Sequence, residues 1–200
     1  MTNDIFLSPH FKLSEFVVSE TASRHGIDNT PPEEAVENLR RLCQGTLEPL
    51  REALQLPVVI TSGFRTKALN DRLAHSSERS QHMQGCAADF YVSSAASPRF
   101  NAALPRFNGP LAQFKVQGSK VDDKVQGSKV QGCREVLIKA FRLIITSHEI
   151  DYDQLILYPN FIHVSYVSKE RNRHNILKAR SNGKLGYGKL SYANAILLNY

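Results

Sequence analysis

A stripe of apolar residues at helical spacing is the feature that most constrains how this 200-residue chain can fold. It follows the segment Thr30-Pro31-Pro32-Glu33, in which Thr30 is suited to cap a helix, proline suits the first turn, and Glu33 completes a capping box. Residues that recur every three or four positions share one helix face and must pack against another element. We therefore predict a core helix to about Leu54, with apolar positions at Val36, Leu39, Leu42, Cys43, Leu47, Leu50 and Leu54.

Short runs of β-branched and aromatic residues predict strands between further helices. Pro159 and Asn160 predict a tight turn, so the two strands on either side of it should form a hairpin. This order of elements predicts an α+β fold in which helices flank a small antiparallel sheet. The expected strands span residues 57–61, 87–92, 154–158 and 161–166, and the further expected helices span residues 66–73, capped by Thr66, and 134–147.

One segment departs from this pattern because it repeats a short polar unit. Lys115–Val121 recurs as Lys124–Val130, and Val130-Gln131-Gly132 begins a third copy. The unit is too short and polar to bury an apolar face, so we predict that residues 94–132 are a mobile insertion without catalytic chemistry. The predicted organisation is one domain over residues 1–180, interrupted by this insertion, with a C-terminal extension over residues 181–200 of unassigned role.

The charge balance narrows the range of partners. The chain has 25 basic and 19 acidic residues, a net charge of +6, which favours polyanions such as nucleic acid, anionic membrane or cell wall. No nucleic-acid motif is recognisable, so we expect no nucleic-acid partner. No apolar run approaches the roughly 20 residues of a spanning helix, and no secretory signal pattern is visible. We expect a monomer made in the cytoplasm, which would reach the cell wall by phage-type release.

The polar segment Ser80–Asp89 carries the residues with the clearest chemistry. It reads Ser-Gln-His-Met-Gln-Gly-Cys-Ala-Ala-Asp, with His82 on a loop and Asp89 on a predicted strand. Gly85 allows a sharp turn between them, so both side chains can point at one centre. His163, which interrupts an otherwise apolar strand, offers a third ligand. Two histidines and one carboxylate suit Zn²⁺ and leave a position for an activated water.

The pattern S-x-H-x-x-G-x-A-x-D, with a later F-x-H on a strand, resembles the signature of the zinc D-Ala-D-Ala carboxypeptidases, which have a hedgehog-type fold. Thr61-Ser62-Gly63-Phe64-Arg65 is similar to the S-G-[YF]-R block of that family. Residues 11–16, 26–31 and 153–156 are similar to a subgroup of cell-wall peptidases. The resemblance covers about residues 5–92 and 134–180.

This resemblance implies a role for five residues. His82, Asp89 and His163 would bind Zn²⁺. Arg65 would bind the substrate carboxylate or the developing oxyanion, a task suited to its fixed and permanently charged guanidinium. Ser80 would orient the loop or contact the substrate.

The general base is the one part that the sequence does not supply. Many members of the family have a carboxylate three residues before the last histidine, and that position is Asn160 here. Asp153, Asp151 and His148 are the nearest alternatives, of which we select Asp153. The basic segment 171–174 either steers the protein to cell-wall anions or is a solvated surface.

The implied function is zinc-dependent hydrolysis of peptide bonds in peptidoglycan stem peptides or cross-links. The sequence leaves open whether the enzyme is a carboxypeptidase or an endopeptidase. Because Asn160 replaces the acid, an alternative also stays open. In that alternative the protein is a catalytically impaired zinc-binding relative that acts as a peptidoglycan- or protein-binding module.

Overall fold

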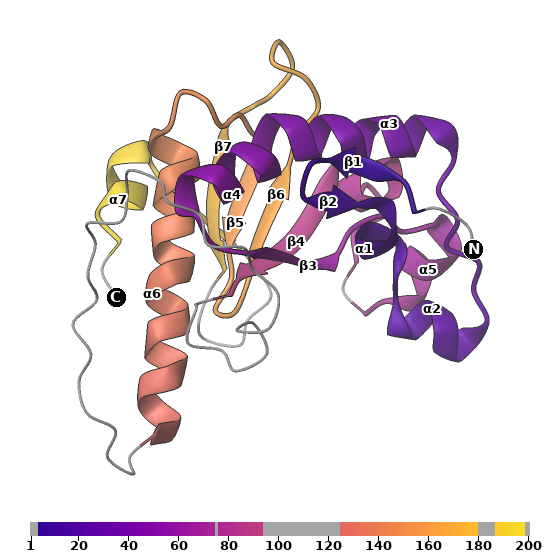
Figure 1. Ribbon diagram of the computed structural model, residues 1–200, viewed down its shortest axis with the longest axis horizontal. Helices are drawn as coiled ribbons and strands as arrows, with labels where there is room; N and C mark the ends of the chain where they lie inside the picture. Colours follow the sequence, from indigo (N-terminus) through magenta and orange to yellow (C-terminus); the bar gives the residue numbers. More distant parts are fainter. Residues whose placement is uncertain (1–3, 75, 94–124, 180–186, 199–200) are drawn as a thin grey trace.

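The computed structural model describes residues 4–74, 76–93, 125–179 and 187–198, which make an α+β fold as the sequence predicts (Figure 1). The N-terminal part contains β1 (Phe6–Ser8), β2 (Phe11–Lys12), α1 (Leu13–Val17), α2 (Glu20–His25), α3 (Glu33–Leu42), the π-helical segment η1 (Cys43–Leu47), α4 (Glu48–Leu54), β3 (Val58–Ser62), α5 (Lys67–Arg72), the 3₁₀ helix η2 (Gln81–Gln84) and β4 (Ala87–Val92). The C-terminal part contains α6 (Val125–Thr146), β5 (Gln154–Leu157), β6 (Ile162–Ser165), β7 (Asn175–Ala179), β8 (Tyr187–Lys189) and α7 (Tyr192–Ile196).

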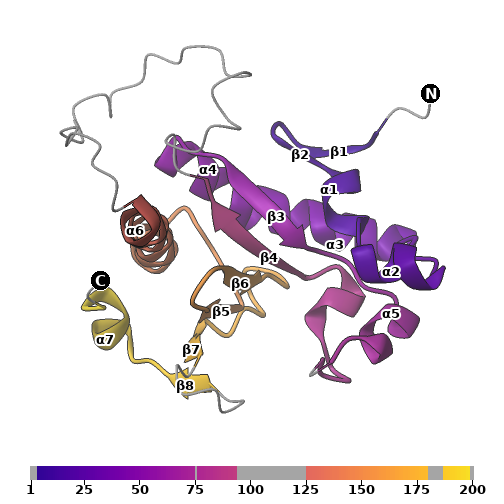
Figure 2. The ribbon, with the colours of Figure 1, turned by 90° about the horizontal axis from the view of Figure 1, so that it is seen from below.

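Within the described residues, six strands form the main sheet in the order β3-β4-β6-β5-β7-β8, and Figure 2 shows them fanning out in this order. The pairs are antiparallel except for β5 and β7, which run parallel. The sequence predicted an antiparallel sheet, and this prediction holds for every pair except β5–β7. The pair β4–β6 joins the N-terminal part of the chain to the C-terminal part.

The two faces of the sheet have different environments. Side chains alternate across a strand, so every second residue points to the same face. Ala88, Phe90, Ile162, Val164 and Leu155 are fully buried in the hydrophobic core. The positions between them therefore belong to the opposite face, and this alternation separates the core from the candidate site.

The core face is covered by the α3–η1–α4 helix and by α6 (Figures 1 and 2). The π-helical segment η1 lies at the point where the α3–η1–α4 helix contacts the residues before β5. There Thr46 Oγ1 donates a hydrogen bond to the carbonyl oxygen of Asp151 at 2.5 Å, and Asp151 N donates to the carbonyl oxygen of Gly45 at 3.1 Å. A Cβ on Gly45 would lie 2.9 Å from the Tyr166 ring. The two hydrogen bonds of Asp151 fix the start of β5 relative to the helix layer, and the Gly45 contact does the same for the residue after β6.

Several predicted elements are confirmed, including β4 over residues 87–92, the β5–β6 hairpin and the Thr66 cap of α5. The prediction that Thr30 caps the core helix is wrong. The N-cap of α3 is Pro32, and Thr30 donates its hydroxyl hydrogen bond to Asp28, because the chain enters the helix two residues later than we expected. No helix of the described residues is long and apolar enough to cross a membrane.

In the C-terminal part, the start of one helix and the number of strands differ from the prediction. Helix α6 starts at Val125 rather than at Arg134, so the backbone of 125–132 is helical. The rest of the predicted insertion, residues 94–124, lies outside the described residues, and its nature stays a prediction. Strand β7 was not predicted, and β8 joins the main sheet from within the segment 181–200. Ala195 of α7 is fully buried in the core.

Gly85 ends η2 in a left-handed conformation, with φ of +70°, and thereby allows the chain to turn into β4. A Cβ at this position would lie 2.3 Å from the carbonyl oxygen of Ala35 on α3. Asn38 of α3 adds a hydrogen bond from Nδ2 to the carbonyl oxygen of Gln84 at 2.9 Å. The turn that carries His82 is therefore packed directly on the backbone of the core helix.

Gly85→Ala should lower the free energy of unfolding by about 3 kcal/mol or more, because backbone strain and a backbone clash add together. Gly26→Ala is the matched control, since Gly26 has a φ of +61° but nothing within 4 Å of the added Cβ. It should lose only about 1 kcal/mol. Urea unfolding of both variants measures the difference, and equal losses would contradict the contact with α3.

Candidate metal centre

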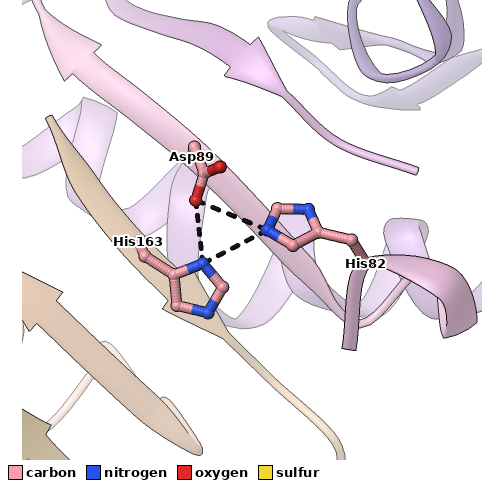
Figure 3. Close-up of side chains that lie close together, drawn as sticks. All are labelled: His82, Asp89 and His163. Carbon is pink, nitrogen blue, oxygen red and sulfur yellow. Dashed lines mark hydrogen bonds and ion pairs between the residues drawn. The ribbon is translucent and has the colours of Figure 1, made fainter. Parts of the chain in front are cut away.

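His82, Asp89 and His163 meet at one point on the face of the sheet opposite the core (Figure 3). His163 Nδ1 lies 2.8 Å from Asp89 Oδ1, and His82 Nε2 lies 3.4 Å from the same oxygen. The two ring nitrogens are 3.2 Å apart. The structure thus brings together the three side chains that the sequence assigns to a metal site.

Strand pairing accounts for two of these three positions. Asp89 of β4 stands directly opposite His163 of β6 in the antiparallel register, so both side chains project from the same face. Ser62 of β3 and Ile156 of β5 continue this row of opposed residues on either side. His82 comes from η2, which directly precedes β4 in the chain and approaches the row from the N-terminal end of that strand (Figure 3).

The orientation of the buried His82 ring is set by a backbone carbonyl. His82 Nδ1 lies 2.6 Å from the carbonyl oxygen of Gly63, so Nδ1 carries the proton and donates it. Burial of the ring lowers its pKa, which favours the neutral imidazole despite the nearby Asp89. Nε2 is then a free lone pair directed at His163 and Asp89, as metal binding requires.

The spacing of the three atoms fits a zinc ion. Tetrahedral zinc with bonds of about 2.0–2.1 Å holds its ligand atoms about 3.3–3.4 Å apart. The observed separations are 2.8, 3.2 and 3.4 Å. A point about 2 Å from each atom therefore exists without any rearrangement of the backbone. The donor set of two imidazole nitrogens and one carboxylate oxygen also suits zinc.

The second oxygen of Asp89 is held by Arg65. Arg65 Nη2 donates to Asp89 Oδ2 at 3.0 Å, and both Nε and Nη2 donate to Ser62 Oγ, at 3.1 and 2.9 Å. Burial alone raises the pKa of Asp89, but His82 and His163 outweigh it and hold that pKa well below its usual range. Asp89 is therefore ionised, with Oδ1 left to the metal position.

These residues line a cleft of about 750 Å³. Ser80, a predicted substrate contact, also lines the cleft, as does Asp153. Asn160, Asp151 and His148 are not among the lining residues; Asp151 instead accepts a hydrogen bond from His174 Nε2 at 2.7 Å. The lining consists of Arg65, Ser76, Ser77, Arg79, Ser80, Gln81, His82, Asp89, Asp153, Gln154, Ile156, Tyr158, Phe161, His163, Val167, Arg171 and Arg173.

Asp153, our selected general base, is fully engaged by its neighbours and is only 1% exposed. Its Oδ1 accepts from the Arg173 backbone N at 2.9 Å and from Arg173 Nε at 2.8 Å. Its Oδ2 accepts from Arg173 Nη2 at 2.5 Å and from Gln81 Nε2 at 2.8 Å. Burial raises the pKa of this carboxyl, but the hydrogen bonds from Arg173 and Gln81 outweigh burial and lower it to about 2. Such a carboxylate is a weak proton acceptor at neutral pH.

Sequence reasoning missed Gln81 and the individual role of Arg173. Gln81 stands next to His82, and a polar residue beside a ligand is the one local signal that could have drawn attention to it. Arg173 was noted only as part of a basic segment. Its pairing with Asp153 is not encoded in any short-range pattern.

A His/Asp/His cluster in an open polar cleft is the arrangement of catalytic zinc sites, which keep one coordination position free. The sequence profile of the peptidase M15 family matches residues 9–118, which is more than half of the 200 residues. The chain therefore belongs to the peptidase M15 family, whose members are zinc-dependent metallopeptidases. The matched range includes His82 and Asp89 and ends before His163. Searches of curated proteins and of solved structures each found no match.

The purified protein should bind one Zn²⁺, and His163→Ala should weaken binding by more than about 100-fold, because it removes a ligand rather than an outer partner. His25→Ala, an exposed histidine on α2, should bind zinc like the wild type. Zinc at about 100 times its Kd should raise the free energy of unfolding by about 2.7 kcal/mol. Competition with a chromophoric chelator and urea unfolding measure these quantities, and wild-type affinity in His163→Ala would refute the site.

Proposed function

We propose that this protein is a zinc-dependent peptidase that hydrolyses peptide bonds in peptidoglycan stem peptides or cross-links. The single observation that carries the proposal is the convergence of His82, Asp89 and His163 in an open cleft. Family membership supports the reaction class. The charge and shape of the cleft, together with the resemblance to cell-wall peptidases, support the substrate class.

Bound at this position, zinc would supply a Lewis acid that polarises the scissile carbonyl and activates water. The protein's own residues supply orientation. Ser62 and Asp89 fix two nitrogens of the Arg65 guanidinium, and no partner of its Nη1 is found among the described residues. Arg65 therefore presents a rigid, permanently charged donor to a substrate oxygen in the same cleft.

The cleft favours an anionic substrate. Four arginines line it, Arg65, Arg79, Arg171 and Arg173, against two carboxylates, Asp89 and Asp153. Arg65 and Arg173 pair with those carboxylates, whereas Arg79 and Arg171 have no side-chain partner in the described part of the chain. Stem peptides of peptidoglycan carry free carboxylates, which such unpaired guanidinium groups attract.

An apolar surface lies within the same cleft. The rings of Tyr158 and Phe161 stack with centroids 4.2 Å apart and an interplanar angle of 13°, at the two ends of the β5–β6 turn. Ile156 and Val167 extend this apolar part of the lining. Small apolar side chains, such as those of alanine residues, have a suitable contact surface there.

A second candidate function rests on the acidic residues of the cleft. Asp89 and Asp153 are the acidic residues that line it within the described chain, and both already bind arginine. Neither is placed to take a proton from water at neutral pH. General-base assistance is worth about 10²–10⁴-fold in rate. The second candidate is accordingly a slow or inactive zinc-binding relative that binds peptidoglycan peptides.

Digestion of purified peptidoglycan distinguishes the two candidate functions. The zinc-loaded wild type should release new amino and carboxyl termini, identified by mass spectrometry, and a chelator should stop the release. His163→Ala should be inactive, with His25→Ala as the active control. A wild type that binds zinc and stem peptides but releases no product would favour the second candidate.

Arg65→Lys should lower kcat/KM for a stem peptide by about 10²-fold, because lysine keeps the charge but loses the fork that contacts Ser62, Asp89 and substrate. Arg24→Lys, an exposed position on α2, is the matched control. Steady-state kinetics give the ratio, and zinc affinity measured in parallel shows whether the metal site is intact. An unchanged kcat/KM would remove Arg65 from the mechanism.

A further inference from the structure

Metal affinity depends on the relative position of η2, which carries His82, and of the β5–β6 hairpin, which carries His163. Helix η2 is well anchored to the N-terminal part of the chain. Arg65 N donates to the His82 carbonyl oxygen at 3.2 Å, and Gly85 packs on Ala35 of α3. All of these contacts are to residues that precede β4. None of them determines where the hairpin lies.

Gln81 makes a side-chain link from η2 to the C-terminal part of the chain. It is the first residue of η2 and the neighbour of His82. Its Nε2 donates to Asp153 Oδ2 at 2.8 Å, across 72 positions of sequence. A hydrogen bond to a charged carboxylate is stronger than one between neutral groups.

Asp153 is in turn joined to the hairpin strand that carries His163. Its backbone N donates to the Ser165 carbonyl oxygen at 2.7 Å, and Ser165 Oγ lies 3.4 Å from Asp153 Oδ2. Ser165 is two residues after His163, on the same face of β6. The chain His82, Gln81, Asp153, Ser165 and His163 is therefore continuous through covalent and hydrogen bonds.

Arg173 keeps the carboxylate ionised and fixed. It contributes three hydrogen bonds to Asp153, from its backbone N, Nε and Nη2. A buried carboxylate without a partner would be strongly destabilising, so this pairing accounts for a charge at a site that is 1% exposed. It also holds Oδ2 in place to receive Gln81.

We propose that Asp153 is a positioning residue, which acts through Gln81 to hold His82 at the spacing from His163 that metal binding requires. This inference rests on the proposed metal site and assigns Asp153 a role other than general base. Outer partners of metal ligands typically contribute about 10–100-fold in metal affinity. Asp153 and Gln81 supply that support without contacting the metal position.

The test compares Gln81→Met, Asp153→Asn and the double variant with the wild type. Gln81→Met keeps the side-chain size and the Asp153–Arg173 pair, so it should fold even if Asp153→Asn does not. Each single variant should raise the Kd for Zn²⁺ about 10-fold. The Kd of the double variant should be close to that of either single variant, because both substitutions remove the same Gln81–Asp153 hydrogen bond. The absorption spectrum of the Co²⁺-substituted protein should shift in all three.

Glu48→Gln is the matched structural control. Glu48 is 6% exposed, accepts from Ser8 Oγ at 2.5 Å and also binds His10, but it lies in α4 outside the cleft lining. It should lower the free energy of unfolding while leaving the Zn²⁺ Kd and the Co²⁺ spectrum unchanged.

Three results would overturn the positioning role. Gln81→Met with wild-type affinity and spectrum would show that the link is unnecessary. An equal loss of affinity in Glu48→Gln would show a general stability effect. A wild type that binds neither metal would remove the proposed function as well, which distinguishes that failure from the other two.

Discussion

The antiparallel pairing of β4 with β6 is the interaction on which the rest of the structure depends. It joins two parts of the chain that are more than 70 positions apart and sets Asp89 directly opposite His163. The same register places Ala88 against Val164 and Phe90 against Ile162 in the core. A slip of one residue would turn the two candidate ligands into the core and the core residues into the cleft. Burial of the apolar face thus specifies the register, and the register places Asp89 opposite His163 in the candidate metal site.

The local parts of this arrangement were predictable from sequence because short-range patterns encode them. The run Ala87–Val92 and the turn at Pro159-Asn160 carry their own strand and turn signals, and a glycine between His82 and Asp89 signals a change of direction. The convergence of His82, Asp89 and His163 was predictable for another reason. Two histidines and a carboxylate in this spacing resemble a known family signature, and the family match supports that resemblance.

The parts that escaped prediction depend on contacts between distant segments. Strand β7 has only a brief apolar pattern and is stabilised by parallel pairing with β5, which no local signal indicates. The link between Gln81 and Asp153 spans 72 positions, and no short-range pattern around Asp153 indicates it. The burial of Asp153 and its three hydrogen bonds from Arg173 are likewise tertiary properties. The Thr30 cap failed because two prolines allow more than one helix start.

The two oxygens of Asp89 have different surroundings, which bears on how the proposed metal site would work. Oδ2 is held by Arg65, so Oδ1 is the oxygen left for a metal, and coordination through one oxygen keeps a further position open. The same ion pair holds Arg65 in the cleft, and under the proposed mechanism Arg65 would be the donor to a developing negative charge on a substrate oxygen. The two sequence blocks, Thr61–Arg65 and Ser80–Asp89, therefore form a single physical unit. Its members are joined by the Arg65–Asp89 ion pair and by the hydrogen bond from His82 to the Gly63 carbonyl oxygen.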